Sequence, residues 1–300
     1  MFFTTGTNPK LAKNLAEKTG LLLGRAQLGR FTDGEVKFTL EEPVTDQQVF
    51  VMGSTHPPAE NLLELLTILN TVKINGAKQI IAVIPYFGYA KSDRPDRPNV
   101  PINARLFAKF IKAAGADKII AVNLHSQYVQ DYFRPNLVHL SAGHLLVRAV
   151  KVWQLSNVVV AAPDMGGKKR AEEFSLALLG HDKICLIEKF RPTADKATVR
   201  KIHDGVAGKN VIIVDDMVQT GGTLISAGDA LKGQGAEEIY IALTHFVFSG
   251  GAIKKLASLP DVKKVVFTDT IPMPADVHLP GKFEIISVVD LLSQAVRGFI

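Results

Sequence analysis

One short pattern occurs three times along the chain and limits the folds available to it. In segments 75–94, 114–127 and 234–251, Gly-Ala is followed by two polar residues and then by an isoleucine that opens an apolar run. A glycine after a helix supplies the left-handed conformation that ends it, and a short apolar run is typical of a parallel strand buried on both faces. The three copies therefore predict an α/β fold, with mainly parallel sheets flanked by helices.

The copies lie in both halves of the chain, which indicates two tandem domains. A single hydrophobic core stops growing near ~250–300 residues, so two domains are favoured for a chain of 300 residues. We expect an N-terminal domain over 1–142 and a C-terminal domain over 143–285. A C-terminal helix within 286–300 is expected to pack back on the N-terminal domain.

Two helices can be placed from local signals. Asn8 is a candidate N-cap, Pro9 fits the first helical position and Gly20 ends the segment, which predicts a short helix. In segment 101–115 the apolar residues Ile102, Leu106 and Phe110 recur every four positions and Gly115 follows, which predicts a helix that ends at this glycine.

Composition excludes several classes of protein. No segment has the composition of disorder, no apolar run approaches the ~20 residues that cross a bilayer, and the first residues lack the pattern of a leader peptide. Cys185 is the only cysteine, so a disulfide framework is excluded. We expect a soluble, cytoplasmic protein without a membrane partner. The net charge of +6 suits nucleic acids or small polyanions, but DNA-binding motifs are missing and no nucleic-acid partner is expected.

The most informative stretch is "VIIVDDMVQTGGTL", residues 211–224. Val211–Val214 predict a buried strand, and an amphipathic helix follows from Thr223, so 220–223 form a strand-to-helix turn. Such a turn exposes backbone N–H groups to an anion, and glycines let a phosphate approach them. Asp215 and Asp216 would repel that phosphate but suit hydroxyls or a metal. A sugar phosphate satisfies both demands, although an acid pair alone is as often a solvated loop.

Further segments extend this observation into a family resemblance. "VIIVDDMVQTGGT" resembles the 5-phosphoribosyl-1-diphosphate (PRPP) motif of type I phosphoribosyltransferase folds. "FTDGE" (31–35), "PYFGYAKSDR" (85–94), "NLHSQ" (123–127), "PDMGG" (163–167) and "EKFRP" (188–192) follow the order and spacing of ribose-phosphate diphosphokinases. The resemblance covers essentially the whole chain and implies two tandem type I phosphoribosyltransferase-like domains. It implies transfer of the β,γ-diphosphoryl group of ATP to the 1-hydroxyl of ribose 5-phosphate, giving PRPP and AMP in nucleotide biosynthesis.

The resemblance also implies residue roles, a Mg²⁺ cofactor and a homo-oligomer that is a dimer or larger, since in relatives the adenine site crosses a subunit interface. Phosphoryl-type transfer depends on positioning and charge neutralisation, which suits cations and Mg²⁺. The implied site residues are catalytic Lys189 and Arg191 on a flexible loop; ATP-binding Phe31, Asp33, Glu35, Lys91, Ser92, Asp93 and Arg94; substrate-binding Arg191, Asp215, Asp216, Gln219, Thr220, Gly221, Gly222 and Thr223; and metal-ligating His125 and Asp164.

The chain departs from the common family pattern at several positions. Gln219 replaces an aspartate, Asn123 replaces another, and Lys91-Ser92 replaces Arg-Gln. Gln219 and its surroundings are similar to the class II branch, which is associated with independence from phosphate activation.

Two alternatives remain open at the level of sequence. A phosphoribosyltransferase that consumes PRPP would share the 211–224 stretch but would not need "FTDGE" or "EKFRP". A catalytically silent regulatory subunit would keep the fold and lose the catalytic loop. Each residue also has an ordinary structural interpretation: Phe31 as core, His125 as a hydrogen-bonded histidine, and Lys189 and Arg191 as a surface pair.

Overall fold

The computed structural model describes residues 1–193, 196–203 and 205–300, of which 189–193 and 196–201 are described by their backbone alone. The chain divides into two compact units. Unit 1 comprises Met1–Ser141, Thr270–Pro272 and Ser287–Ile300, and unit 2 comprises Ala142–Asp269 and Met273–Ile286. None of the helices in the described ranges is long and apolar enough to cross a membrane.

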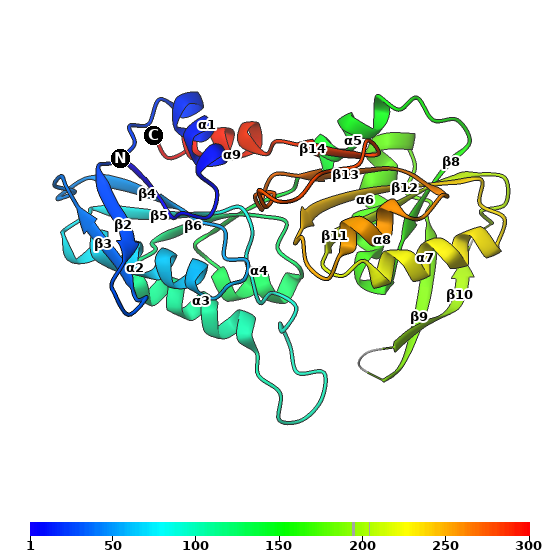
Figure 1. Ribbon diagram of the computed structural model, residues 1–300, viewed down its shortest axis with the longest axis horizontal. Coiled ribbons are helices and arrows are strands. Elements are labelled where there is room, and N and C mark those ends of the chain that lie inside the picture. The colour runs from blue at the N-terminus through cyan, green and yellow to red at the C-terminus, as the bar shows by residue number, and fades with distance from the viewer. Residues whose placement is uncertain (194–195, 204) are drawn as a thin grey trace. The chain divides into compact units, whose positions relative to one another are not determined.

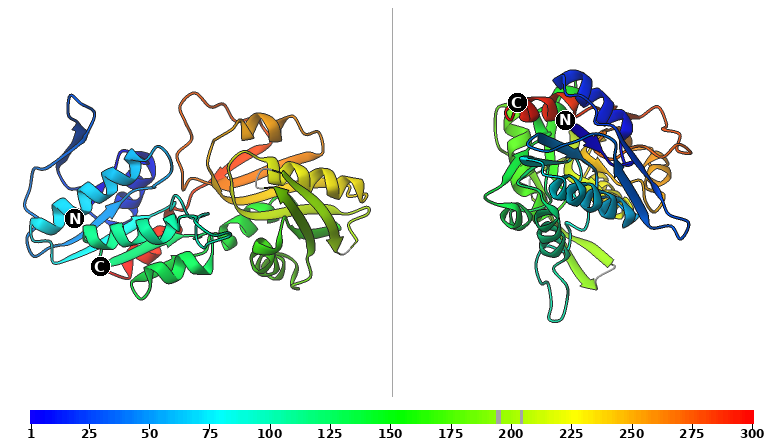
Figure 2. Two further views of the ribbon diagram at one scale, coloured as in Figure 1. Left: turned by 90° about the horizontal axis from the view of Figure 1, so that it is seen from below. Right: turned by 90° about the vertical axis from the view of Figure 1, so that its left-hand side faces the viewer.

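Unit 1 is built on a five-stranded, fully parallel sheet in the order β1-β4-β5-β6-β7 (Figure 1). An antiparallel pair, β2 and β3, forms a separate hairpin that extends away from this sheet (Figure 2). The elements of unit 1 are β1 (Phe2–Thr4), α1 (Pro9–Thr19), β2 (Ala26–Arg30), β3 (Val36–Leu40), β4 (Gln48–Met52), α2 (Glu60–Ile74), β5 (Gln79–Ile84), α3 (Asn103–Ala114), β6 (Lys118–Val122), α4 (Gln127–Phe133), β7 (Leu137–Leu140) and α9 (Val289–Arg297).

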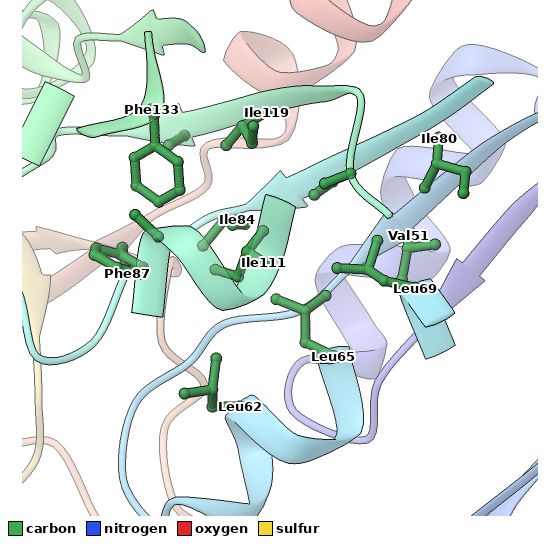
Figure 3. Close-up of a cluster of buried hydrophobic side chains, with 14 of the residues drawn as sticks. Val51, Leu62, Leu65, Leu69, Ile80, Ile84, Phe87, Ile111, Ile119 and Phe133 are labelled. Carbon is green, nitrogen blue, oxygen red and sulfur yellow. The ribbon is translucent and has the colours of Figure 1, made fainter. Parts of the chain in front are cut away.

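The core of unit 1 lies between this sheet and the helices α2 and α3. Leu65 and Leu69 of α2 and Ile111 of α3 pack against Val51 and Ile84 of the strands (Figure 3). Helices α1 and α9 pack against each other although they come from opposite ends of the chain. Unit 1 is therefore closed by its own C-terminal helix.

Local signals predicted α1 well and α3 only in part. The side chain of Asn8 accepts a hydrogen bond from the first turn of α1, Pro9 begins the helix, and Gly20 ends it in a left-handed conformation, as predicted. Helix α3 ends at Gly115 as predicted, but the spaced apolar residues do not form its buried face, because Leu106 and Phe110 are 43% and 44% exposed.

The face of α3 that is buried carries smaller side chains. Ala104, Ala108 and Ile111 are fully buried there. Alanines let α3 approach α2 and the sheet closely, and this gain in packing outweighs burial of the larger residues on the other face.

Unit 2 contains a seven-stranded sheet in the order β10-β9-β8-β11-β12-β13-β14, parallel except for the β9–β10 pair. Its elements are α5 (Gly143–Lys151), β8 (Val158–Ala162), the 3-10 turn η1 (Met165–Gly167), α6 (Lys168–Leu179), β9 (Cys185–Thr193), β10 (Lys196–His203), β11 (Asn210–Val218), α7 (Gly222–Gly233), β12 (Glu238–Phe246), α8 (Ala252–Ala257), β13 (Val262–Thr268) and β14 (Phe283–Ile286).

The sheet of unit 2 is buried on both faces. Val211 and Ile213 of β11 belong to one hydrophobic cluster, while Ile212 and Val214 belong to another. Successive side chains of a strand point to opposite faces, so helices must cover both sides of this sheet. The continuous apolar run that predicted a parallel strand is explained by this double burial.

The repeated pattern is confirmed in both units. Each Gly-Ala pair precedes β5, β6 or β12, and the glycines have left-handed φ values of 81° at Gly76, 129° at Gly115 and 83° at Gly235. The structure thus has the predicted α/β architecture, with parallel sheets flanked by helices in each unit.

Candidate active site

The acid pair of the sequence lies within strand β11 rather than at its tip. The strand was expected to end at Val214, but its ladder with β12 continues through Asp215 to Val218. On the other side, β8 pairs with β11 only as far as Ile213. Because the two neighbouring strands differ in length, Asp215 and Asp216 are part of a strand and also lie beyond the end of β8.

One arginine holds both carboxylates. Arg170, in the first turn of α6, places Nη1 3.0 Å from Asp215 Oδ1 and Nη2 3.5 Å from Asp216 Oδ1. The backbone N–H of Asp216 also donates to Asp215 Oδ1 over 2.8 Å. The side chains of Asp215 and Asp216 are only 14% and 6% exposed, so this ion-pair cluster has little contact with water.

Sequence reasoning missed Arg170. The only available signal was its position in "PDMGGKKR", which follows strand β8 at the edge of the sheet where ligands bind in such folds. Three cations end that segment, and nothing in the pattern distinguishes the third of them from its neighbours.

A third acid acts on the pair. Burial, and next the charge of Asp216, hold the pKa of Asp215 well above its usual range, while the Arg170 guanidinium opposes the rise and Asp164 adds to it. Asp164 itself lies in the turn after β8, where its carboxylate accepts a hydrogen bond from the N–H of Gly167 at 3.2 Å. The structure thus brings together three predicted residues, Asp164, Asp215 and Asp216, beyond the carboxyl end of β8.

The predicted phosphate loop connects β11 to α7. Gly221 has a left-handed φ of 80°, α7 begins at Gly222, and the N–H of Ile225 closes the first helical turn onto the carbonyl of Gly221. Thr220 and Gly222 are exposed, whereas Gln219 and Thr223 are half-buried. The N-terminus of a helix of this length, preceded by a glycine turn, can bind a phosphate through backbone N–H groups.

A second turn supports this loop from behind. The N–H of Val247 donates to the carbonyl of Val218 over 2.9 Å, which joins the two strands where the loop starts. At Gly250, a Cβ atom would lie 2.9 Å from the γ-methyl of Thr220, so only glycine fits without displacing the loop. Lys255 Nζ donates to the carbonyl of Thr220 at 3.5 Å.

In unit 1, the predicted adenine-binding residues form the tip of the β2–β3 hairpin. The N–H of Phe31 donates to the carbonyl of Glu35, and the N–H of Glu35 donates to Asp33 Oδ1, which fixes the turn. Phe31 is 51% exposed, with Lys37 Nζ 5.5 Å from the centre of its ring. Because an exposed aromatic ring on an ordered turn can stack on a planar ligand, this tip has the features expected of a base-binding element.

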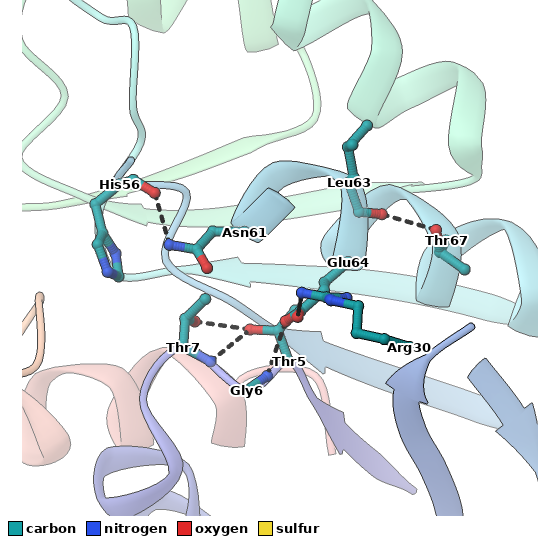
Figure 4. Close-up of polar contacts among 9 residues, drawn as sticks. All are labelled: Thr5, Gly6, Thr7, Arg30, His56, Asn61, Leu63, Glu64 and Thr67. Carbon is teal, nitrogen blue, oxygen red and sulfur yellow. Dashed lines mark hydrogen bonds and ion pairs between the residues drawn. The ribbon is translucent and has the colours of Figure 1, made fainter. Parts of the chain in front are cut away.

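A buried carboxylate ties the hairpin to the body of unit 1. Arg30, at the end of β2, forms an ion pair with Glu64 Oε1 at 2.6 Å, and Glu64 Oε2 accepts from the N–H of Gly6 at 3.1 Å (Figure 4). The side chain of Glu64 is 9% exposed. This carboxylate thus links the end of β2 to α2 and to the backbone at Gly6, beside the packing of Phe38 against Phe3.

The segment 91–94 lies within the long connection between β5 and α3. The hydroxyl of Ser92 donates to the carbonyl of Pro101 and accepts from the N–H of Asn103, so it closes this loop onto the start of α3. Arg94 places its guanidinium 5.4 Å from the ring centre of Tyr128.

Two further predicted residues flank that closure. Asp93 is buried, with its carbonyl accepting from the hydroxyl of Tyr132 over 2.6 Å. Lys91 is exposed. Of the four residues in 91–94, the two cations are thus the solvent-exposed ones, and Ser92 already has a structural role.

His125 lies in the turn between β6 and α4. Asn123 opens that turn with a left-handed φ of 40°, and Ser126 caps α4 by accepting from the N–H of Val129. The N–H of Leu124 donates to Nε2 of His139 over 3.0 Å. An imidazole on β7 thus fixes the backbone next to His125.

The two predicted catalytic cations lie on β9, in the hairpin that β9 forms with β10 (Figure 1). The backbone at Lys189 and Arg191 belongs to strand β9, and Lys189 pairs with Val199 across the hairpin, so the role expected of these residues on a flexible catalytic loop stays a prediction. The side chains of both cations fall outside the described part of the chain.

Within the described ranges, no group of three or more His, Cys, Asp or Glu side chains forms a preformed metal cage. Magnesium commonly binds through one or two carboxylates and completes its shell with water and substrate phosphates. The carboxylate of Asp164, at a strand end beside the acid pair, fits this donor chemistry. The imidazole of His125, in the other unit, is a softer ligand than magnesium prefers.

Known protein families match segments of both units of the chain. Residues 1–115 match the N-terminal domain of ribose phosphate pyrophosphokinase, and residues 138–279 match the phosphoribosyl transferase domain. The chain is similar to the ribose-phosphate pyrophosphokinase of Caldanaerobacter subterraneus subsp. tengcongensis, with 42% identity over 98% of this chain and 92% of the relative. For the enzyme of Pasteurella multocida, the identity is 39% over 98% of this chain and 94% of the relative.

A solved structure agrees with these sequence matches. The crystal structure of phosphoribosylpyrophosphate synthetase from Mycobacterium smegmatis superposes with a TM-score of 0.92 at 31% identity, covering 100% of this chain and 98% of the other. Both matched domains and the full-length relatives lead to one conclusion. The chain belongs to the ribose-phosphate pyrophosphokinase family.

Proposed function

We propose that this protein transfers the β,γ-diphosphoryl group of ATP to the 1-hydroxyl of ribose 5-phosphate, releasing AMP and forming PRPP. The observation that carries the proposal is the C-terminal part of β11, where two largely buried carboxylates precede a glycine turn at a helix N-terminus. Carboxylates accept hydrogen bonds from hydroxyls, and helix N-termini bind phosphate, so together they suit a sugar phosphate. Membership of the family over nearly the whole chain supports the same substrate.

In this proposal each part of the β11–α7 connection contacts one end of ribose 5-phosphate. Asp215 and Asp216 accept hydrogen bonds from the ribose hydroxyls. The segment 219–223 holds the 5-phosphate with backbone N–H groups and the hydroxyls of its threonines. Binding both ends of the sugar fixes its 1-hydroxyl for in-line attack, which is the main contribution an enzyme makes to phosphoryl-type transfer.

The nucleotide is assigned to unit 1. Phe31, Asp33 and Glu35 of the hairpin tip contact adenine, Phe31 by stacking and the acids by accepting from its amino group. The segment 91–94 contacts the phosphates through Lys91 and Arg94. Since the hairpin extends away from its own sheet, we propose that it completes the site of a second copy, so that the active species is at least a homodimer.

Catalysis is assigned to the β9–β10 hairpin and to magnesium. Lys189 and Arg191 neutralise charge on the transferred group, and Asp164 and His125 would each serve as a magnesium ligand. Bound magnesium would supply additional positive charge to the phosphoryl oxygens. Removing one such stabilising group commonly lowers turnover by ~10²–10³-fold.

The test is incubation with MgATP and ribose 5-phosphate, using ATP labelled in its β-phosphate. AMP and labelled PRPP are expected, and Lys189→Ala should reduce both while Lys169→Ala, an exposed control on α6, should not. Absence of AMP formation would reject the proposal. Consumption of PRPP with a nucleobase would identify a phosphoribosyltransferase instead, and inactivity with both substrate pairs would identify a silent subunit.

Gln219 makes a second claim testable. An amide at this position removes one negative charge beside the bound 5-phosphate while keeping hydrogen bonds. We propose a class II-like enzyme that does not require activation by inorganic phosphate. A strong rise in rate on adding phosphate to the purified protein would refute this claim without affecting the proposed reaction.

A further inference from the structure

The acid pair on β11 depends on a residue outside the predicted site. Arg170 reaches from α6 across to both Asp215 and Asp216, with its side chain 22% exposed. Arg170 Nη1 donates to Asp215 Oδ1 over 3.0 Å, so the contact is a charge-assisted hydrogen bond rather than a loose surface pair.

This contact determines which oxygen of Asp215 can receive a substrate. Oδ1 accepts from Arg170 Nη1 at 3.0 Å and from the N–H of Asp216 at 2.8 Å. A carboxylate oxygen has two lone-pair positions, and both positions of Oδ1 are therefore used by the protein. A ribose hydroxyl must approach Oδ2, and the plane of the carboxylate is set before the sugar arrives.

The charges of these three side chains also favour a positioning role for Arg170. Two carboxylates side by side repel each other, and their burial strengthens the repulsion. The guanidinium faces both of them, so it reduces the cost of keeping the pair ionised and able to accept. A lysine would supply the charge, but its single ammonium lacks the planar fork that contacts two carboxylates at once.

Arg170 also follows closely on the turn of the proposed metal ligand. Asp164 accepts from Gly167, and Arg170 Nη1 would lie 3.6 Å from a Cβ atom at Gly167. A larger residue at Gly167 would therefore contact the guanidinium. One short segment thus carries both the proposed metal ligand and the cation that orients the acid pair.

We propose that Arg170 is a positioning residue for the acceptor sugar, fixing Asp215 and Asp216 in the orientation in which they accept from the ribose hydroxyls. The inference rests on the assignment of these acids to ribose 5-phosphate. It concerns a residue that contacts the acids and not the reacting atoms, so its effect should fall on sugar binding.

The experiment compares Arg170→Met and Arg170→Lys with Lys169→Met, which changes the neighbouring, 87% exposed side chain on the same helix. Steady-state KM values for ribose 5-phosphate and ATP are measured together with kcat. We expect Arg170→Met to raise KM for ribose 5-phosphate by ~10–100-fold, the range for losing a hydrogen bond to a charged group, with a much smaller change for ATP. Arg170→Lys should recover part of that loss, and Lys169→Met should resemble the wild type.

A double-mutant cycle separates positioning from general stability. In an Asp215→Asn background, Arg170→Met should raise KM for ribose 5-phosphate far less than in the wild type, because the two changes disrupt one interaction. Additive effects, equal changes in both KM values, or a change in kcat alone would overturn the inference. If Arg170→Met does not fold, the Arg170→Lys variant carries the same comparison. Failure of the wild type to form AMP would instead reject the proposed reaction.

Discussion

The turn behind the phosphate loop allows a controlled pair of substitutions. Gly250 and Gly251 are adjacent and have similar left-handed φ values of 59° and 69°. A Cβ atom at Gly250 would lie 2.9 Å from the γ-methyl and 3.2 Å from the Cβ of Thr220, whereas a Cβ at Gly251 would meet nothing within 4 Å. Gly250→Ala and Gly251→Ala therefore share the same backbone strain, and only the first also presses on the loop.

The magnitudes follow from this geometry. Placing alanine in a left-handed conformation costs ~1–2 kcal/mol of folding free energy in either variant. To restore an ordinary 3.4 Å contact from 2.9 Å, Thr220 must move by about 0.5 Å in Gly250→Ala. A shift of that size weakens hydrogen bonds from the loop to a phosphate, and a loss of ~1–2 kcal/mol corresponds to a ~5–30-fold weaker affinity.

The assay measures the midpoint of thermal unfolding and KM for ribose 5-phosphate in both variants. Both should unfold at reduced temperatures, and only Gly250→Ala should show a ~5–30-fold higher KM for the sugar phosphate. KM for ATP should stay near the wild-type value in both. Equal KM values for ribose 5-phosphate in two folded variants would refute the claim that the turn positions the loop.

Three further predictions concern single side chains. Because burial and Asp216 raise the pKa of Asp215, its ionised form destabilises the folded protein as pH rises through that pKa. Asp215→Asn should therefore unfold at a higher temperature than the wild type at neutral pH and show no such advantage in acid. A variant that is less stable than the wild type at neutral pH would contradict this. Burial lowers the pKa of His139, so the stability that this residue contributes is complete above pH 6.5 and is lost as pH falls through the lowered pKa. In chemical denaturation, His139→Gln should therefore lose less of its free energy of unfolding in acid than the wild type loses. Phe31→Ala should change the free energy of unfolding by no more than ~0.5 kcal/mol, because the residue is 51% exposed, and it should raise KM for ATP. An unchanged KM for ATP would remove Phe31 from the adenine site.

Features set by neighbouring residues could be predicted from the sequence. The cap at Asn8, the proline after it and the glycine at position 20 all act within one helix, and the structure has each of them as predicted. The glycines before β5, β6 and β12 act within one turn, and they too adopt the expected conformation. These signals are local, so the rest of the fold does not alter them.

Features set by distant partners were predicted less well. Helix α3 has two apolar faces, and only its packing partner decides that Ala104 and Ala108 are buried instead of Leu106 and Phe110. Strand β11 extends past Val214 because β12 is longer than β8, and periodicity along one strand does not contain that information.

The candidate site shows the same division. The family motifs identified Asp164 and the acid pair, and the structure brings them to one edge of a sheet. Arg170 contacts Asp215 across 45 positions of sequence, and no local pattern links the two. A residue that acts only through another residue leaves little trace in sequence spacing.

The shared packing of α1 and α9 has a consequence for synthesis of the chain. Leu291, Leu292 and Val296 of α9 are buried, α9 packs against α1 near the N-terminus, and Lys18 forms an ion pair with Asp290. A ribosome releases the first helix long before its partner, so unit 1 stays incomplete until unit 2 has been translated. Nascent chains that stop before residue 287 should therefore leave α1 accessible to a protease, and chains carrying α9 should protect it.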